Sequence, residues 1–138
     1  MECYHNMFIN KNCHVYRMIK TNLNFEKYLT MQKLTFSQRD ALTKFRCGSN
    51  KLLINKYSFS NDIEDKMCPI CDLRELGDEF HYIFICPYLR KEREQFIKKY
   101  YRLRPNALKF GELFNSKSVK TLVNLAKFCK FIMNFFDA

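Results

Sequence analysis

The amino-acid sequence predicts a small, mostly α-helical domain in which a Cys/His knuckle is inserted between an extended segment and C-terminal helices. Glycine and proline are scarce, with three of each in 138 residues, which disfavours a turn-rich sandwich or barrel. Apolar residues recur at helical spacing through much of the chain after residue 37. Four potential metal ligands interrupt these helical patterns, so we expect helices combined with one metal knuckle.

Length and composition fit one compact body. Hydrophobic residues make up 47% of the chain and charged residues 28%, which provides a core and argues against a disordered tail or a collagen-like fibre. The length is too short for the palm and fingers of a polymerase or for two full globular units. We expect short helices over residues 1–35 and the main helical domain over residues 36–138, within a single globular unit.

The first well-marked helix is expected to begin near Ser37. The segment Ser37-Gln-Arg-Asp40 has the form of a capping box, and apolar residues follow it at helical spacing. Gly48 suits the left-handed residue that ends such a helix. The next stretch, residues 52–59, alternates in part between apolar and polar side chains, and we expect it to be extended.

Three further helices are expected toward the C-terminus. The first runs from Pro87 to about Arg102, because proline suits a first helical turn and Pro105 ends the pattern. A short helix from about Asn106 to Phe114 precedes a long one from Ser116 to about Phe136. The apolar face of the long helix is wider than a single stripe, so it is either buried in the core or contacts another chain. Fourteen phenylalanines in so short a chain favour the core.

A cysteine and histidine motif is the strongest chemical signal. Cys68-Pro-Ile-Cys71 is followed by nine residues, His81, four residues and Cys86. Two cysteines separated by two residues can turn around one ion, and the second pair completes a tetrahedron. Three thiolates and one imidazole suit zinc better than calcium or magnesium, which prefer oxygen ligands. We therefore expect one structural Zn²⁺ in a CCHC zinc knuckle, with no position open for a catalytic water.

Other interpretations of this motif are weaker. A dithiol redox pair would follow a strand in a βαβ unit, which the surrounding pattern does not predict. The four groups could also be buried without an ion. A zinc deaminase needs His-x-Glu ahead of Pro-Cys-x-x-Cys, and the order and spacing here differ. A second candidate site is weakened because adjacent cysteine and histidine rarely reach one ion; its residues are Cys3, His5, Cys13 and His14.

The chain contains no recognisable catalytic pattern. It has no nucleophile with a partner base, no phosphate loop, no Gly-rich fingerprint and no spaced acidic set. Cys47 and Cys129 lie on apolar faces of expected helices, where a thiol is usually a small hydrophobe. We therefore expect no enzymatic activity.

Charge and cysteine content indicate the setting in which the protein works. Twenty-four Lys and Arg against fourteen Asp and Glu give a formal charge of +10, which is typical of proteins that bind phosphate backbones or anionic surfaces, although codon bias could also produce it. No signal peptide pattern and no uncharged window of membrane-spanning length are present. An odd number of cysteines, seven, fits a disulfide framework poorly. We expect an intracellular protein of the nucleus or cytoplasm, without a membrane partner.

The metal motif lies within a longer pattern. A helix ends in an Arg-x-Gly-Ser turn, and the cysteine pair, an acidic patch, a His-x₄-Cys-Pro group and further helices follow. The residues are Leu42-Thr-Lys-Phe-Arg46-Cys-Gly48-Ser49, Lys51-Leu-Leu-Ile, Cys68-Pro-Ile-Cys71, Asp78-Glu79-Phe80 and His81-Tyr-Ile-Phe-Ile-Cys86-Pro87. Over roughly residues 14–136 this pattern resembles the zinc-binding segment C-terminal to the reverse transcriptase domain in non-LTR (LINE-type) retrotransposon polyproteins. Asn50 stands where that family frequently has histidine, and an arginine near position 58 is missing.

The resemblance implies a non-catalytic module that binds template RNA or target DNA beside the polymerase. Polymerase chemistry does not carry over, because the Tyr/Phe-x-Asp-Asp box of reverse transcriptases is absent. The cations expected to bind phosphates flank the metal motif and are Lys44, Arg46, Lys51, Arg90, Lys91, Arg93, Lys98 and Lys99.

Two further expectations concern aromatic residues. Tyr57, Tyr82 and Tyr88 are candidates for stacking on unpaired bases, although such side chains more often belong to the core.

The alternative function is a protein-interaction module. In it the wide apolar face of the last helix, with Phe131 and Phe135, docks on a polymerase domain or on a second copy of the chain.

Overall fold

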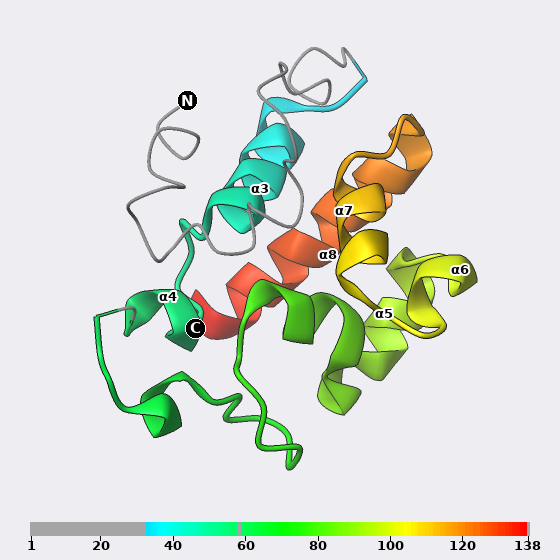
Figure 1. The fold of residues 1–138 in the computed structure, drawn as a ribbon. Coiled ribbons are helices and arrows are strands. Elements are labelled where there is room, and N and C mark those ends of the chain that lie inside the picture. The colour runs from blue at the N-terminus through cyan, green and yellow to red at the C-terminus, as the bar shows by residue number, and fades with distance from the viewer. Residues whose placement is uncertain (1–32, 58, 138) are drawn as a thin grey trace.

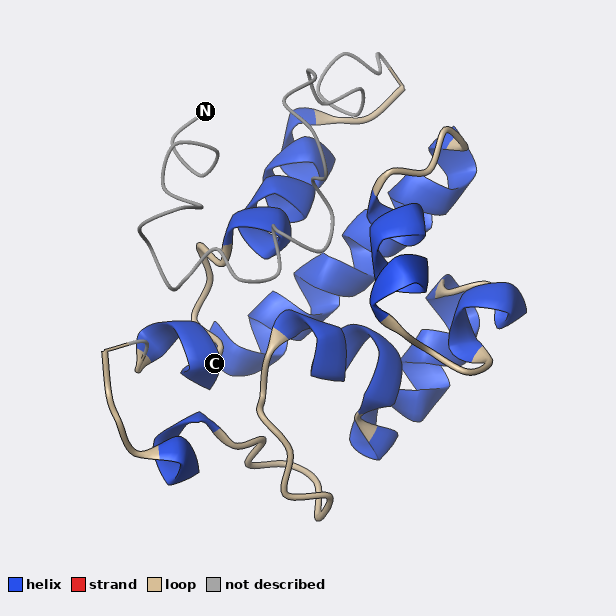
Figure 2. Cartoon of the chain, viewed as in Figure 1, coloured by secondary structure: helices blue, strands red, loops and turns tan. Residues whose placement is uncertain are grey.

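The computed structural model describes residues 33–57 and 59–137 of the chain. This part consists of helices joined by short loops, and no β-strand is assigned within it (Figure 2). The expected mostly α-helical fold is therefore confirmed. The short helices expected over residues 1–35 lie almost entirely outside the described residues.

Helix α3 (Phe36–Cys47) opens the described part, and its capping box differs from the predicted one. Thr35 is the N-cap, and its hydroxyl accepts a hydrogen bond from the backbone N–H of Gln38 at 3.1 Å. The Gln38 side chain accepts from the backbone N–H of Thr35 at 3.0 Å, which completes the box. The prediction at Ser37 was two residues too late. Gly48 ends the helix with a φ of 69°, as expected.

The segment predicted to be extended contains one helical turn, α4 (Leu53–Lys56). The carbonyl of Leu52 accepts hydrogen bonds from the backbone N–H groups of Asn55 and Lys56, both at 2.9 Å. The extended assignment was wrong for these four residues, because a short, partly alternating run does not separate a strand from a single helical turn. A 3₁₀ helix, η3 (Ile63–Lys66), follows after Asp62 as N-cap.

The helix expected from Pro87 to Arg102 is divided into three pieces. These are the 3₁₀ turn η5 (Pro87–Leu89), α5 (Arg90–Phe96) and α6 (Lys99–Arg102). Ile97 has an extended backbone conformation, with φ −112° and ψ 128°, and its side chain is buried. Proline therefore opens this region as predicted, but the burial of Ile97 coincides with a break that the apolar pattern alone did not reveal.

The last two helices match their expected positions closely. Helix α7 (Ala107–Phe114) begins after Asn106, whose side chain accepts from the backbone N–H of Lys109 at 2.9 Å. Helix α8 (Val119–Asp137) starts about three residues later than predicted.

Helix α8 is the centre around which the other helices pack. Helices α3, α5 and α7 contact it, and Figure 1 shows it passing through the middle of the described part. Its buried face includes Leu125, Phe128 and Ile132, and the ring of Phe96 in α5 stacks on Phe128 at a centroid distance of 6.2 Å. Most of the wide apolar face therefore belongs to the domain's own core.

Two phenylalanines of α8 remain partly outside this core. Phe131 is 38% exposed and Phe135 is 37% exposed.

Within residues 33–57 and 59–137, no helix combines the length and hydropathy that crossing a bilayer would require.

Candidate metal centre

A tight hairpin places the first two cysteines. The backbone N–H of Cys68 donates to the carbonyl of Glu75 at 2.8 Å, and that of Gly77 donates to the carbonyl of Lys66 at 2.8 Å. Between these bonds the chain reverses, with Arg74 in the left-handed region at a φ of 55°. The reversal brings Cys71 back toward Cys68, as expected for two cysteines separated by two residues.

A π-helix, η4 (His81–Ile85), places the other two candidate ligands. The backbone N–H of Cys86 donates to the carbonyl of His81 at 2.8 Å, five residues back. This wider turn brings residues five apart closer to the same side of the helix than an α-helix with 3.6 residues per turn does. His81 and Cys86 are thus presented from the same side, and both are buried.

The four predicted ligands converge. Their donor atoms all lie within 4.8 Å of one another. The Sγ atoms of Cys68 and Cys86 are 3.9 Å apart, and Cys71 Sγ lies 3.4 Å from His81 Nε2. A tetrahedron with metal bonds of about 2.3 Å to sulfur and about 2.0–2.1 Å to nitrogen has edges of roughly 3.8 and 3.6 Å. The group can therefore hold one metal ion with little rearrangement.

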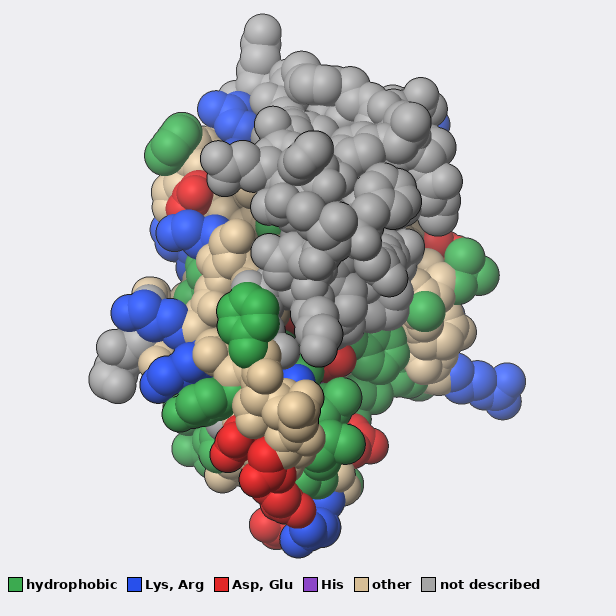
Figure 3. Space-filling model, turned by 60° about the vertical axis from the view of Figure 1, so that its left-hand side comes forward, with side chains coloured by type: hydrophobic (Ala, Val, Ile, Leu, Met, Phe, Trp, Pro, Cys, Tyr) green, Lys and Arg blue, Asp and Glu red, His purple; other side chains and the backbone are tan. Residues whose placement is uncertain are grey.

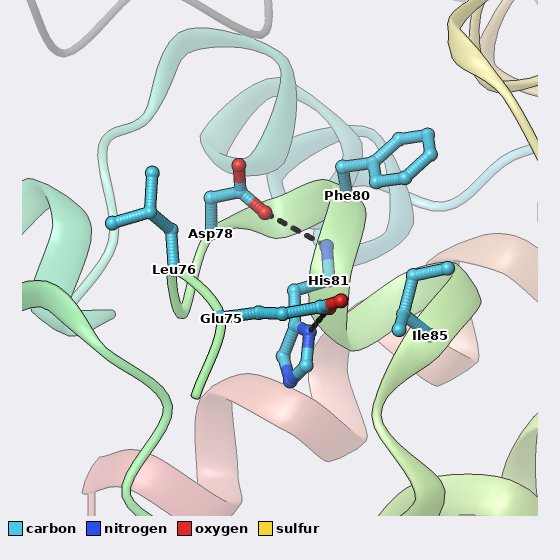
Figure 4. A pocket seen from close by; sticks show the side chains of 6 residues that line it. All are labelled: Glu75, Leu76, Asp78, Phe80, His81 and Ile85. Carbon is cyan, nitrogen blue, oxygen red and sulfur yellow. Dashed lines mark hydrogen bonds and ion pairs between the residues drawn. The ribbon is translucent and has the colours of Figure 1, made fainter. Parts of the chain in front are cut away.

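His81 is oriented by two carboxylates outside the ligand set (Figure 4). Its Nδ1 lies 3.2 Å from Glu75 Oε2, and its backbone N–H donates to Asp78 Oδ1 at 2.8 Å. A carboxylate accepts, so Nδ1 carries the hydrogen and the lone pair of Nε2 points toward Cys71. Burial lowers the pKa of His81 and outweighs the opposite effect of Glu75, which keeps the imidazole neutral near pH 7.

Burial favours the neutral form of two candidate thiols, those of Cys71 and Cys86, when no ion is bound. Burial raises the pKa of Cys86 to about 12 and also raises the pKa of Cys71. Thiolates in this pocket therefore need a cation to offset their charge, which is the role of a bound metal ion.

Close packing surrounds the first cysteine. Tyr82 is fully buried, and its hydroxyl makes no hydrogen bond to the described residues. Burial, followed by the neighbouring Cys68, raises the pKa of this phenol. A Cβ atom on Gly77 would lie 2.7 Å from the Tyr82 hydroxyl oxygen and 3.2 Å from the Cα of Cys68, so a larger residue there would force these neighbours to shift. The interpretation of Tyr82 as a stacking residue was wrong, because the core encloses the ring.

A shallow pocket of about 320 Å³ opens beside His81. It is lined by Glu75, Leu76, Asp78, Phe80, His81 and Ile85 (Figure 4). The imidazole wall of the pocket belongs to the candidate ligand set, and both carboxylates bond to His81. The pocket is thus an outer face of the metal centre.

Two of the eight predicted phosphate-binding cations are buried, which corrects their assignment. Arg46 is 1% exposed, and its guanidinium donates to the carbonyl of Phe114 at 3.0 Å and to Asn115 Oδ1 at 3.3 Å. Arg93 is 6% exposed and donates to the carbonyls of Tyr82 and Ile83. Both arginines bond to the protein interior, so neither belongs to a phosphate-binding surface.

The remaining predicted cations are exposed but lie in two groups. One group lies in the last turn of α3 and just after it, and the other lies on α5 and at the start of α6; the residues are Lys44, Lys51, Arg90, Lys91, Lys98 and Lys99. Helices α3 and α5 both contact α8 and lie on different sides of it in Figure 1, so the segments that carry the two groups are separated in that view. Tyr57 and Tyr88 are exposed, at 40% and 61%.

Sequence reasoning missed the residues that surround the ligands. Glu75 gave no spacing signal, because its role depends on a bond to a histidine six residues away across a loop. Arg93 was grouped with surface cations because its neighbours in sequence are basic. It differs from Arg90 and Lys91 because its side chain lies on the buried face of α5. The second candidate site, Cys3, His5, Cys13 and His14, lies outside the described residues.

The chain matches no protein-family model, no curated protein and no solved structure.

Proposed function

We propose that this chain is a non-catalytic, zinc-stabilised helical module that binds nucleic acid through basic side chains. The convergence of three sulfur donors and one imidazole nitrogen within 4.8 Å is the observation that carries the proposal. Zinc is favoured because thiolate and imidazole ligands in tetrahedral geometry suit it best among the common ions. Four protein ligands fill that geometry, so the ion stabilises the fold and leaves no site for a reacting water.

Charge distribution argues against one end of the molecule as the contact surface for nucleic acid. Residues 61–79, around the hairpin, carry seven acidic and two basic residues, although the whole chain has a charge of +10. Figure 3 shows acidic side chains gathered at the lower end of the molecule, where Figure 1 places this hairpin. Phosphates would be repelled there, so the proposed contacts are the predicted cations that remain exposed, at the end of α3, on α5 and at the start of α6. The resemblance to the retrotransposon segment favours RNA template or target DNA as the ligand.

Metal analysis tests the first half of the proposal. The purified protein is expected to contain one zinc per chain, and cobalt substitution is expected to give the intense d–d absorption of a tetrahedral site. Because ion binding and folding are coupled in such sites, chelation should reduce helix content measured by circular dichroism. A metal-free preparation with unchanged helix content would contradict the zinc assignment.

A salt titration with single-stranded RNA tests the second half. Each phosphate contact contributes a slope of about −0.7 to the logarithm of affinity against the logarithm of salt concentration. Replacing four exposed cations on α5 and at the start of α6 by glutamine is expected to flatten the slope by up to about 2.8. The substituted residues are Arg90, Lys91, Lys98 and Lys99, which are all exposed.

A matched control removes the same charge elsewhere. Lys117, Lys120, Lys127 and Lys130 lie on or just before α8 and are also exposed. Their replacement by glutamine changes net charge equally and is expected to alter the slope much less. Equal effects of the two quartets would mean that net charge, not a defined surface, drives binding. A slope near zero in the unmodified protein would overturn nucleic-acid binding altogether.

The exposed aromatic residues favour a second candidate function, docking of α8 on a polymerase domain or on another copy. Tyr88 packs against Phe135 with ring centroids 5.7 Å apart, and Phe131 is exposed on the same helix as Phe135. Sedimentation should then show self-association that Phe131→Glu abolishes. Leu108→Glu is the control, because Leu108 is 72% exposed on α7. A concentration-independent monomer would exclude the self-association form of this function.

A further inference from the structure

Arg93 occupies an unusual position next to the candidate metal centre. It lies on α5, where its exposed neighbours Arg90 and Lys91 point to solvent, yet its own side chain is only 6% exposed. Its Nε donates to the carbonyl of Ile83 at 2.8 Å and its Nη2 to the carbonyl of Tyr82 at 2.9 Å. Both carbonyls belong to the π-helix that begins with His81 and ends next to Cys86.

A buried guanidinium is costly unless an opposite charge lies close by. Arg93 makes no ion pair within the described residues, and the two groups that accept its hydrogen bonds there are neutral carbonyls. Burial lowers the pKa of Arg93 to about 10, and only Cys86 and Glu92 act in the opposite direction. Because the carbonyls that Arg93 binds belong to the π-helix that ends next to Cys86, negative charge on the sulfur of Cys86 is a natural partner for this cation.

The candidate ligand set supplies that charge once an ion is bound. Three thiolates and a neutral imidazole around a divalent ion have a net charge of −1, in a site where Cys68, His81 and Cys86 are buried. We propose that Arg93 is the buried counter-charge of the loaded metal centre, stabilising the thiolate of Cys86 while its guanidinium holds the π-helix that presents two of the four ligands. This inference rests on the metal assignment of the proposed function, but not on nucleic-acid binding.

A purely structural role predicts something different. If Arg93 only binds two carbonyls, its loss lowers the zinc affinity of any set of four ligands to the same extent, whatever the net charge of that set. If Arg93 neutralises the centre, its contribution depends on the number of thiolates. Cys71→His separates these cases, because Cys71 is the half-buried ligand and a Cys₂His₂ set with a divalent ion has no net charge.

The experiment measures zinc affinity of the full chain by competition with a chromophoric chelator. Arg93→Gln is expected to weaken zinc binding about tenfold or more, the range usual for residues that support metal ligands. Arg93→Lys, which keeps the charge, should stay within about threefold of the unmodified protein. In the Cys71→His background, Arg93→Gln should have less than about a threefold effect. Arg90→Gln is the control, because this side chain is 81% exposed on the same helix.

Cobalt spectra provide a second readout that does not depend on the fraction of folded protein. A cation beside Cys86 lowers the energy of the sulfur lone pairs, so Arg93→Gln should shift the sulfur-to-cobalt charge-transfer band to longer wavelength, and Arg93→Lys should restore it. Equal losses of affinity in both ligand backgrounds, or equal losses for Gln and Lys with an unshifted band, would overturn the counter-charge role. Failure of the unmodified protein to bind zinc or cobalt would instead overturn the metal assignment itself, and this inference with it.

Discussion

His81 Nδ1 lies 3.2 Å from Glu75 Oε2, so a carboxylate outside the ligand set turns the imidazole until Nε2 lies 3.4 Å from Cys71 Sγ. Histidine ligands in metal sites commonly donate their second N–H to a carboxylate in this way, which fixes the tautomer and increases the basicity of the ligand. Glu75 is half exposed, whereas His81 is almost completely buried, so the carboxylate links the centre to the surface.

Glu75→Ala is expected to weaken zinc binding by about 10- to 100-fold without removing a ligand. The loss follows because the imidazole can then rotate and is less basic. Competition with a chelator measures the effect. Glu94→Ala, which removes an exposed carboxylate paired with Arg90, should leave zinc affinity unchanged. Equal affinities of the Glu75 variant and the unmodified protein would show that His81 is oriented by packing alone.

Metal affinity should fall steeply as pH decreases. Burial raises the pKa of Cys71 and raises that of Cys86 to about 12, so both thiols are protonated near neutral pH without metal. Binding must release at least these two protons, and the logarithm of apparent affinity should therefore rise by at least about two per pH unit between pH 6 and 8. Cobalt titrations at constant ionic strength measure this slope. A slope near zero would mean that the two thiols do not ligate the ion.

Gly77 and Tyr82 should show strong coupling in a double-mutant cycle. Gly77→Ala places a methyl group 2.7 Å from the Tyr82 hydroxyl and should destabilise the protein by about 1–3 kcal/mol. Tyr82→Phe removes a buried hydroxyl without a hydrogen-bond partner among the described residues, and should itself be neutral or stabilising. Adding it to Gly77→Ala should recover part of the loss. Chemical unfolding of the four proteins gives the coupling energy, and strictly additive effects would contradict the predicted clash.

The helical elements and the ligand set were predictable where the signal is local. Spacing alone grouped Cys68, Cys71, His81 and Cys86, because two short ligand pairs separated by a loop can close around one ion. Asn106 and Gly48 mark helix ends through their own side chain or backbone freedom, and both were placed correctly.

Features that depend on distant contacts were not predictable from the sequence. The break at Ile97 accompanies burial of its side chain, and the π-helical turn accompanies the approach of Cys86 to Cys68. Arg46 and Arg93 were assigned to the surface because the sequence gives the charge of a side chain but not whether that side chain points to solvent or to the core. Arg46 is buried and bonds to the carbonyl of Phe114, which lies 68 residues away along the chain. Arg93 is buried and bonds to the carbonyl of Ile83, which lies 10 residues away.

Arg46 should contribute to stability and not to nucleic-acid binding. Its guanidinium connects the end of α3 to the end of α7 through the carbonyl of Phe114 and the side chain of Asn115. Arg46→Met keeps much of the side-chain volume but leaves that buried carbonyl without this donor, which should lower the free energy of unfolding by about 2–3 kcal/mol. Chemical unfolding measures the loss.

The matched control is Lys44, two residues earlier on the same helix and 46% exposed. Lys44→Met breaks only a surface pair with Asp40, so it should cost less than about 1 kcal/mol of stability. If Lys44 contacts phosphate, its loss flattens the salt dependence of RNA binding by about 0.7, whereas Arg46→Met leaves that slope unchanged under conditions in which the variant is folded. A flatter salt dependence of RNA binding for the folded Arg46 variant would mean that Arg46 contacts nucleic acid, which would contradict its burial.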